Sequence, residues 1–499
     1  MADTDLAQTL RAMGRGESGL RGWIAVLDQV FVALERAAWE LRAAADASVA
    51  SWQAAGASAA SARAEAGRFL RRQERLGRSG WTLARVIAGY RLYGVYSAFL
   101  GAARRVDVLE RLHRKSAQRF LATCVAHGGG FLKLGQMLSA RPDLLPAAWV
   151  EELAQLQDDA PAEPFAAVRA VVEAELGAPL GELFARFDEQ PLAAASIGQA
   201  HRALTHEGLE VVVKVQRPGV GELIELDLAV LESALAGLGG MLPPTDLETI
   251  TAEVRAQVRR ELDYRAELAA MQRMRALFAD RPGVVVPRPI PELSTARVLT
   301  ASYVAGDKIT VALDRIAAAG DHQGVSTLLG ALLDATLRQV LGAGFFQADP
   351  HPGNFLVTAA GELVLLDFGC VRELGDDVRR GYVSLLMAFL AGDKQAMAAL
   401  FPRLGFATRS GGTETLEIMT AALLDRFRAA AARGSFTWPT RQEIFAQAAE
   451  TLEASQRDPV VRIPAEFVML GRVFATQAGL FQHYRPAIDY VRCVLPHLG

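Results

Sequence analysis

The chain has few cysteines, no excess of charge of one sign and no long uncharged apolar run. Its three cysteines, Cys124, Cys370 and Cys493, lie far apart and form no CxxC pair. This argues against a disulfide framework or a zinc site and fits a reducing compartment. The net charge of −3 provides no basic field, so no nucleic-acid partner is expected. No uncharged apolar run reaches the roughly 18–20 residues that a membrane helix needs.

The N-terminus lacks the basic start and apolar core of a signal peptide. The nearest candidate for a membrane helix, residues 81–100, is interrupted by Arg85 and Arg91. Residues 81–93 mix aromatic, aliphatic and arginine side chains, which is typical of an interfacial membrane helix and equally of a helix packed against the rest of the protein. We therefore expect a cytoplasmic chain without a transmembrane helix, with at most peripheral contact at the inner face of the membrane.

Residue spacing predicts a small sheet-bearing part between two helical parts. With 499 residues, 51% of them hydrophobic, the chain has material for more than one core. Apolar residues at helical intervals predict helices at 20–41, 54–76 and within 81–125. β-branched runs predict strands at 208–216, 284–286 and 297–304, and a charged helix pattern covers 246–277. The rest is largely helical, with breaks at 405–412 and Trp438-Pro439, which is the order of a kinase.

The most informative feature is the spacing of polar residues around a predicted hairpin at 355–366. Asp349 begins the segment Asp-Pro-His-Pro-Gly-Asn, Asn354 ends it, and Asp367-Phe-Gly follows the hairpin. Phosphoryl transfer needs a carboxylate near the attacking oxygen and oxygen ligands that hold Mg²⁺ against the phosphates. In protein kinases an Asp, an Asn five positions later and the Asp of D-F-G supply these groups. The spacing therefore predicts Asp349 as the catalytic carboxylate and Asn354 and Asp367 as Mg²⁺ ligands. Alone, Asp367 would be a turn residue.

Lys214 lies within the apolar run Val-Val-Val-Lys-Val-Gln, where the third strand of a kinase carries the lysine that contacts the α- and β-phosphates. A lysine in an apolar strand is costly to bury unless it meets an anion. The alternative is an edge-strand lysine that points to solvent. Its carboxylate partner is expected on the following helix, where Asp263 and Glu267 are four residues apart and share a face, while Glu261 points elsewhere.

The loop expected to cover the phosphates departs from ordinary kinases. They use a glycine-rich turn so that backbone amides can approach the phosphates. Here Ala193, Ala194 and Ala195 replace the glycines and Ser196 follows them. Because alanine has a Cβ atom, the loop is expected to be stiffer and to restrict how closely it covers the γ-phosphate. In isolation, the alanine triplet would instead be the start of a buried helix.

Together these motifs resemble the UbiB family of atypical kinases, also called the Abc1, AarF or ADCK-like family, over about residues 85–400. Lys133-Leu-Gly-Gln136 is similar to its K-x-G-Q signature; alone, Lys133 would be a snorkelling surface lysine. The Ala193–Ser196 segment is similar to its alanine-rich loop, Glu261-Leu-Asp263 to its E-x-D motif, and Asp349 to Asn354 to its D-x-H-P-G-N loop.

The resemblance implies an α+β, atypical protein-kinase-like fold in which the K-x-G-Q segment lies over the substrate cleft. In that picture Lys133, Gln136, Glu261 and Asp263 are regulatory, Lys133 reaches chiefly Glu261, and Glu267 pairs with Lys214. The expected regions are a helical N-terminal region at 1–80, a family-specific extension at 81–165, a kinase-like N-lobe at 166–305 and a helical C-lobe at 306–499.

The resemblance also implies binding of ATP or ADP with Mg²⁺, ATPase rather than protein-kinase behaviour, and a role in coenzyme Q or other isoprenoid-lipid metabolism. The expected partners are a nucleotide and an isoprenoid lipid or quinone precursor, and a homodimer is compatible with the sequence. One alternative is a true protein kinase, against which stand the alanine-rich loop, the K-x-G-Q segment and the lack of an Ala-Pro-Glu segment. The other is a non-catalytic nucleotide-binding scaffold, against which stands the retention of Lys214, Asp349, Asn354 and Asp367.

Overall fold

The computed structural model describes residues 59–97, 100–127, 129–139, 145–156, 161–238, 255–256, 258–418 and 457–498. The chain divides into two compact units. Unit 1 comprises Met1–Pro161, Ala194–Ile197 and Gly219–Ala256, and unit 2 comprises Ala162–Ala193, Gly198–Pro218 and Gln257–Gly499. The predicted helix at 20–41 and the break at Trp438-Pro439 lie outside the described residues, and the four expected regions stay predictions.

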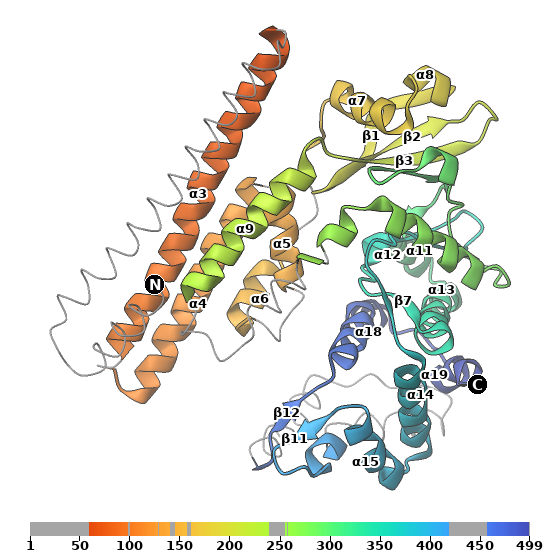
Figure 1. The fold of residues 1–499 in the computed structure, drawn as a ribbon. Helices are drawn as coiled ribbons and strands as arrows, with labels where there is room; N and C mark the ends of the chain where they lie inside the picture. The colour runs from red at the N-terminus through yellow and green to blue at the C-terminus, as the bar shows by residue number, and fades with distance from the viewer. Residues whose placement is uncertain are drawn as a thin grey trace. The chain divides into compact units, whose positions relative to one another are not determined.

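The described part of unit 1 is helical (Figure 1). Its helices are α3 (Ala59–Ser97), α4 (Ala102–His127), α5 (Gly129–Ser139), α6 (Ala147–Leu153) and α9 (Val220–Leu238). Helix α4 packs against α3, α5 and α6, and α9 packs against α3 and α5. Phe120 and Phe131 meet edge to face in the core of this unit, beside Leu83 and Leu153. The helices predicted at 54–76 and 81–125 are therefore helical where they are described, but α3 runs through both predicted segments.

The first part of unit 2 contains a four-stranded sheet. Its strands are β1 (Arg186–Ala194), β2 (Gly198–Leu204), β3 (Glu210–Gln216) and β5 (Val298–Ser302), in the order β1-β2-β3-β5. Helices α7 (Phe165–Leu176) and α8 (Leu180–Leu183) belong to the same part of the chain, and α7 packs on β3. β1 and β2 were not among the predicted strands, because their residues lack a run of β-branched side chains.

Alternation along β3 determines which side chains meet the core and which meet the site. Val211, Val213 and Val215 are buried in one cluster with residues of α7 such as Val172. Successive side chains of a strand point to opposite faces of the sheet. Lys214 is therefore placed on the other face of the sheet, between valines that belong to the core.

The prediction of one continuous charged helix at 246–277 is wrong, because the described part of this range contains a break. A short helical segment at 258–261 ends before Asp263, and α11 (Tyr264–Leu277) begins directly after it. Asp263 is the N-cap of α11, because its carboxylate accepts a hydrogen bond from the backbone N–H of Arg265 at 3.1 Å. This cap restarts the helix and places Glu267 in the first turn of α11. Residues 246–254 lie outside the described part.

The rest of unit 2 adds three short sheets. β4 (Val284–Val285), β9 (Leu363–Leu365), β8 (Phe355–Val357) and β6 (Asp307–Lys308) form one of them, with β4 parallel to β9 and the other pairs antiparallel. β7 (Phe345–Gln347) pairs with β10 (Val371–Glu373), and β11 (Ala407–Thr408) pairs with β12 (Val460–Arg462). The predicted hairpin at 355–366 is thus present as the β8–β9 pair.

Helices complete unit 2 around a large core. They are α12 (Ile309–Ala318), α13 (His322–Leu337), α14 (Asp376–Ala391), α15 (Lys394–Arg403), α18 (Ala465–Tyr484) and α19 (Tyr490–Val494). The shorter turns are η1 (Pro291–Leu293), the π-helical η2 (Arg338–Ala343), η3 (Pro352–Asn354) and η4 (Leu495–His497). Leu313, Leu329, Phe346 and Val473 are buried in this core.

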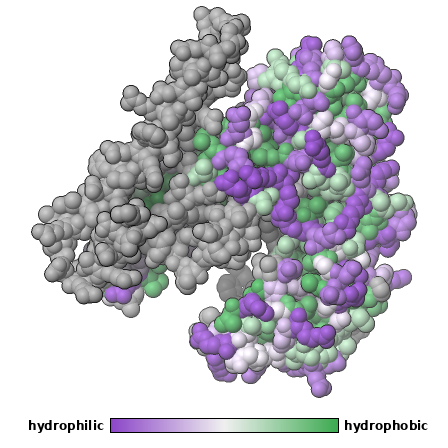
Figure 2. Space-filling model, in the orientation of Figure 1, coloured by the Kyte–Doolittle hydropathy of each residue, from purple (hydrophilic) through white to green (hydrophobic). Residues whose placement is uncertain are grey.

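Hydrophilic residues are spread over the face of unit 2 shown in Figure 2, with smaller hydrophobic areas between them. This is the usual surface of a domain whose large apolar side chains lie in its core. No helix in the described ranges is both long enough and apolar enough to cross a membrane.

Candidate functional site

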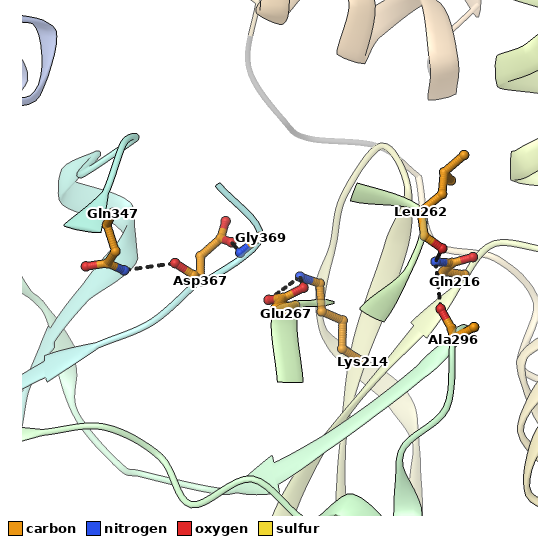
Figure 3. Close-up of polar contacts among 8 residues, drawn as sticks. All are labelled: Lys214, Gln216, Leu262, Glu267, Ala296, Gln347, Asp367 and Gly369. Atoms are coloured by element: carbon orange, nitrogen blue, oxygen red, sulfur yellow. Dashed lines mark hydrogen bonds and ion pairs between the residues drawn. The ribbon is translucent and has the colours of Figure 1, made fainter. Parts of the chain in front are cut away.

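Lys214 in β3 contacts Glu267 in the first turn of α11. The Lys214 Nζ atom lies 2.9 Å from Oε1 and 2.8 Å from Oε2 of Glu267 and donates hydrogen bonds to both (Figure 3). The side chain of Lys214 is 35% exposed, whereas that of Glu267 is only 7% exposed. A carboxylate this deeply buried requires a cation and hydrogen bonds to offset its lost hydration. The partner of Lys214 is thus Glu267, and the alternative of a lysine that simply points to solvent does not describe this geometry.

The Lys214 ammonium also experiences the charge of Asp367. Burial by itself would lower the pKa of Lys214, but the charge interactions with Glu267, Tyr264 and Asp367 outweigh burial and raise this pKa above its usual range. The Nζ atom lies 5.0 Å from the centre of the Tyr264 ring. Lys214 is therefore a cation at physiological pH that contacts the Glu267 carboxylate and also experiences the charge of Asp367.

Asp367 has an unusual backbone conformation that its neighbours stabilise. Its φ angle is 58°, in the left-handed region that residues other than glycine rarely adopt. The Gln347 Nε2 atom donates hydrogen bonds to the carbonyl oxygens of Leu366 at 2.7 Å and Asp367 at 2.8 Å. The Gly369 N–H donates to the Asp367 Oδ1 atom at 3.0 Å. In Figure 3 these contacts place Asp367 between Gln347 and the Lys214–Glu267 pair. Strained conformations of this kind cost on the order of 1–3 kcal/mol and cluster at functional sites.

The β8–β9 hairpin brings the segment of Asn354, which precedes β8, next to the segment of Asp367, which follows β9. Phe355 pairs with Leu365, and the Leu366 N–H donates to the carbonyl oxygen of Asn354 at 2.9 Å. Asn354 and Asp367 therefore lie at the same open end of the hairpin.

The loop before Asn354 is held by its own backbone and side chains. The Asn354 Nδ2 atom donates to the carbonyl oxygen of Asp349 at 3.2 Å, which closes the loop. The Gly353 N–H donates to His351 Nδ1 at 3.1 Å. Asp349 itself is exposed. The loop thus has the exposed Asp349 at its beginning and the predicted metal ligand Asn354 at its end.

This set of side chains fits a divalent cation with an anionic ligand. Mg²⁺ prefers oxygen ligands, which the Asp367 carboxylate and the Asn354 amide provide. Two carboxyl groups, those of Glu267 and Asp367, act on a single ammonium group, and a divalent cation would offset their negative charge. The 35% exposed Lys214 side chain offers a cation to phosphate oxygens. The roles assigned to these residues nevertheless stay predictions.

The alanine-rich segment is a strand end and a turn. Ala193 and Ala194 end β1, Ala195 and Ser196 lie in the turn, and β2 begins at Gly198. The alternative of a buried helix start is therefore wrong, and Ala193 is exposed. Ala194 to Ser196 belong to unit 1 and Lys214 to unit 2. Their role in covering phosphates stays a prediction.

The four residues predicted to be regulatory are divided between the two units. Lys133 and Gln136 lie on α5 of unit 1, and the side chain of Lys133 is outside the described part. Glu261 and Asp263 belong to unit 2. Asp263 has a structural role as the N-cap of α11. The contact between Lys133 and Glu261 stays a prediction.

Two buried glutamines were missed in the sequence. Gln216 and Gln347 are each 4% exposed, and each donates through Nε2 to two backbone carbonyl oxygens. Each ends a largely apolar strand, Val-Val-Val-Lys-Val-Gln or Phe-Phe-Gln. A glutamine side chain at the end of an apolar run needs buried hydrogen-bond partners, so the position of these residues in the sequence already indicated a structural role.

Comparison with known proteins identifies the family. Residues 155–401 match the model of the ABC1 atypical kinase-like domain. Protein ACTIVITY OF BC1 COMPLEX KINASE 7, chloroplastic, of Arabidopsis thaliana is 33% identical over 77% of this chain and 54% of its own length. AarF domain-containing protein kinase 1 of Xenopus tropicalis is 32% identical over 66% of this chain and 64% of its own length. The chain thus spans between about half and two thirds of these relatives.

A solved structure supports the same fold. The structure of Rv3197 from Mycobacterium tuberculosis in complex with erythromycin matches 77% of this chain and 99% of its own chain, with a TM-score of 0.50 and 22% identity. At this identity the match bears on the fold alone. The expected α+β, atypical-kinase-like fold with a helical N-terminal region is confirmed. The chain belongs to the ABC1 family of atypical kinase-like proteins, also called the UbiB or AarF family.

Proposed function

We propose that this protein is an Mg²⁺-dependent ATPase or small-molecule kinase that supports ubiquinone or other isoprenoid-lipid metabolism. The observation that carries the proposal is the Lys214–Glu267 ion pair, whose ammonium also experiences the charge of Asp367. In phosphoryl transfer the protein mainly positions the nucleotide and stabilises charge, and these three groups are suited to that task.

Each residue has a separate part in this proposal. Lys214 binds oxygens of the α- and β-phosphates, and Glu267 holds the ammonium in place. Asn354 and Asp367 hold Mg²⁺, which when bound neutralises the charge that develops on the transferred phosphoryl group. Asp349 orients the attacking water or hydroxyl group and accepts its proton. ADP fits the same residues as ATP, since neither Lys214 nor the metal ligands require the γ-phosphate.

Thermal-shift titration tests the nucleotide site directly. Mg·ATP should raise the unfolding temperature of the wild-type protein, and EDTA should remove the effect. Asp367→Asn should abolish it, because a metal ligand loses its charge while asparagine still tolerates the left-handed backbone. Asp393→Asn is the matched control, since Asp393 caps α15 and plays no part in the proposed site. Equal stabilisation of wild type and Asp367→Asn by Mg·ATP would reject the assignment.

The two alternative functions predict different results with the same protein. A nucleotide-binding scaffold would bind Mg·ATP without releasing phosphate. A protein kinase would transfer the γ-phosphoryl group to added proteins faster than to water. Phosphate release from ATP that depends on Mg²⁺ and is lost in Asp367→Asn supports the proposed ATPase.

Lipid and quinone profiling tests the metabolic role. A strain that lacks the gene should change its quinone or isoprenoid-lipid content, and the wild-type gene should restore it. The Asp367→Asn gene should fail to restore it if turnover is required. An unchanged lipid profile in the deletion strain would reject the metabolic role while leaving the nucleotide site untouched.

A surface of unit 1 supports peripheral contact with an anionic membrane. Trp81, Leu92 and Tyr96 of α3 are 61%, 48% and 54% exposed. Together with the exposed Arg85 they follow a helical spacing that places them along one side of α3. Basic residues outnumber acidic ones several-fold between residues 81 and 125, although the whole chain has 53 Lys and Arg against 56 Asp and Glu. Exposed aromatic side chains with surrounding positive charge are suited to a bilayer surface.

Vesicle sedimentation tests this contact. The protein should sediment with phosphatidylglycerol vesicles and not with phosphatidylcholine vesicles, and Trp81→Ser with Tyr96→Ser should weaken the binding. Val461→Ser in unit 2 removes a comparably exposed apolar side chain and is the control. If the double variant instead turns a dimer into a monomer in sedimentation velocity, α3 forms an interface between two copies, and the membrane proposal is rejected.

A further inference from the structure

A single side-chain amide connects strand β3 to the beginning of helix α11. Gln216 is 4% exposed, and its Nε2 atom donates to the carbonyl oxygens of Leu262 at 2.6 Å and Ala296 at 3.2 Å (Figure 3). The same Ala296 carbonyl accepts from the Tyr264 N–H at 3.0 Å. Both hydrogens of one NH₂ group are therefore donated to two segments, one two residues before α11 and one two residues before β5.

The position of this amide couples it to the Lys214–Glu267 pair. Lys214 and Gln216 are two residues apart on β3, so their side chains leave the strand on the same face. Glu267 lies in the first turn of α11, close to the point that Gln216 holds. A shift of the helix start relative to β3 would therefore move the carboxylate away from the ammonium. Displacements of about 1 Å can lower catalytic rates by roughly 10²-fold.

Contacts from other side chains of the protein hold the remainder of α11. Arg273 in the middle of the helix donates to both carboxylate oxygens of Glu373, at 2.8 Å and 3.1 Å, and lies over the ring of Phe345. The Arg338 Nε atom donates to the carbonyl oxygen of Leu277, the last residue of the helix, at 2.9 Å. Helix α11 is thus attached at its beginning, middle and end.

We propose that Gln216 is a positioning residue that fixes the start of α11, so that the Lys214–Glu267 pair is assembled before a nucleotide binds. Glutamine suits this task because its two N–H donors satisfy two buried carbonyl groups at once. Methionine has a similar length but no donor, so it would leave both carbonyls without this partner. The effect of Gln216 on turnover rests on the proposed ATP site, whereas its effect on α11 rests on the contacts alone.

Hydrogen exchange on the ligand-free protein tests the effect on α11. In Gln216→Met the backbone amides of residues 264–268 should exchange at least about tenfold faster than in the wild type, because the helix start opens more often. Gln477→Met is the matched control. Gln477 is 2% exposed and donates to Thr336 Oγ1 at 2.8 Å, away from α11. Unchanged exchange at 264–268 in Gln216→Met, or an equal increase there in Gln477→Met, would overturn the proposal.

A double-mutant cycle with Glu267 separates positioning from a general loss of stability. Gln216→Met should weaken Mg·ATP binding or turnover by about tenfold in the wild-type background. In the Glu267→Gln background, where the ion pair is already lost, the same substitution should change the measured value less than about twofold. The loss of unfolding temperature should be similar in both backgrounds. Equal functional losses in both would show a merely structural role and overturn the proposal.

Two further measurements apply if the Gln216→Met variant does not fold or if the protein binds no nucleotide. If Gln216→Met does not fold, Gln216→Asn retains an amide too short to reach both carbonyls, and it should show the same pattern with smaller changes. If the wild-type protein binds no nucleotide, the proposed function fails, and hydrogen exchange at 264–268 still decides whether Gln216 positions α11.

Discussion

The two sides of the candidate site are held by different kinds of interaction. On the β3 and α11 side, two charged side chains contact each other, with the Lys214 Nζ atom 2.8 Å and 2.9 Å from the Glu267 oxygens. On the hairpin side, hydrogen bonds from the Gln347 side chain to backbone carbonyl groups hold Asp367, whose φ angle is 58°. The first side therefore depends on charge, whereas the second depends on backbone conformation. A substitution that removes charge but keeps the shape of a side chain should therefore affect the two sides of the site to different extents.

Each side also has a buried glutamine that binds two carbonyl groups, but the two glutamines do different things. Gln216 joins two segments that are distant in sequence, at Leu262 and Ala296. Gln347 binds the adjacent carbonyls of Leu366 and Asp367 and so stabilises one local conformation. Loss of Gln216 should affect the position of a helix, and loss of Gln347 should affect the direction of one carboxylate.

The largest effect is expected from removal of the ion pair. Lys214→Ala or Glu267→Ala should each lower ATP turnover by about 10²-fold or more, because a positioning charge is lost. The double variant should be little worse than either single one, since the residues act as a unit. Steady-state phosphate release measures all three variants. Additive losses would mean that the two residues serve different sites.

An exposed ion pair in the same sheet provides the control for this prediction. Arg202 contacts both oxygens of Glu210 at 2.7 Å, and both side chains are partly exposed. Pairs of this kind contribute about 0–1 kcal/mol to stability. Arg202→Ala should therefore leave ATP turnover within about twofold of the wild type. A loss as large as that of Lys214→Ala would show that any damage to the sheet reduces turnover.

An intermediate effect is expected when the hairpin side loses its glutamine. Gln347→Met removes the donors to Leu366 and Asp367, so the left-handed conformation of Asp367 is less favoured. The affinity for Mg²⁺ in the presence of ATP should fall by about tenfold, while hydrogen exchange in α11 should stay unchanged. Titration of ATP turnover with Mg²⁺ measures the first quantity. Unchanged Mg²⁺ dependence together with a lower unfolding temperature would show that Gln347 stabilises the fold but does not position the metal ligand.

A smaller effect is expected in the alanine-rich segment. Ala193→Gly or Ala194→Gly should raise ATP affinity by about two- to fivefold, which corresponds to the roughly 0.4–1 kcal/mol by which alanine and glycine differ in backbone freedom. ATP and ADP affinities of both variants should be compared with those of Ala200→Gly in the neighbouring strand β2. Unchanged affinities in both variants would show that the alanines do not restrain nucleotide binding.

The smallest effect is expected from the protonation of His201 at acidic pH, which should lower the stability of the fold. His201 lies in β2, outside the charged site. Burial lowers the pKa of His201, and a hydrogen bond to the carbonyl oxygen of Asp188 at 2.8 Å opposes this. Because the unfolded chain then binds a proton more readily, the free energy of unfolding should decrease as the pH falls below the unfolded pKa of about 6.5.

Thermal unfolding between neutral and mildly acidic pH measures this term. The unfolding temperature of the wild type should fall more steeply with acidification than that of His201→Gln. Only the slope matters, because the substitution itself changes stability at every pH. Parallel slopes would mean that His201 does not contribute to the acid sensitivity of the fold.

Local sequence spacing predicted much of the hairpin and its motifs. The apolar runs on both sides of residues 358–362 predicted a hairpin, and the β8–β9 pair is present there. The valines around Lys214 predicted β3 in the same way. These elements follow from hydrogen bonds and side-chain alternation over a few residues, and such short-range effects can be read along the chain.

Other elements could not be predicted from the pattern of residue types alone. The cap at Asp263 divides a continuous charged helix pattern, and the pattern alone does not show where a helix restarts. β1 and β2 contain few β-branched residues, and their strand conformation depends on pairing within the sheet.

The sequence by itself determined which chemical groups the site contains, since Lys214, Asp349, Asn354 and Asp367 follow a kinase-like order along the chain. The tertiary structure showed the contact between Glu267 and Lys214 that the family resemblance implies. It alone decided that Asp367 adopts a left-handed conformation and that Gln216 and Gln347 hold the surrounding backbone. The physical reason is that these contacts join residues separated by tens of positions. Their geometry arises from the packing of strands and helices that no local pattern specifies.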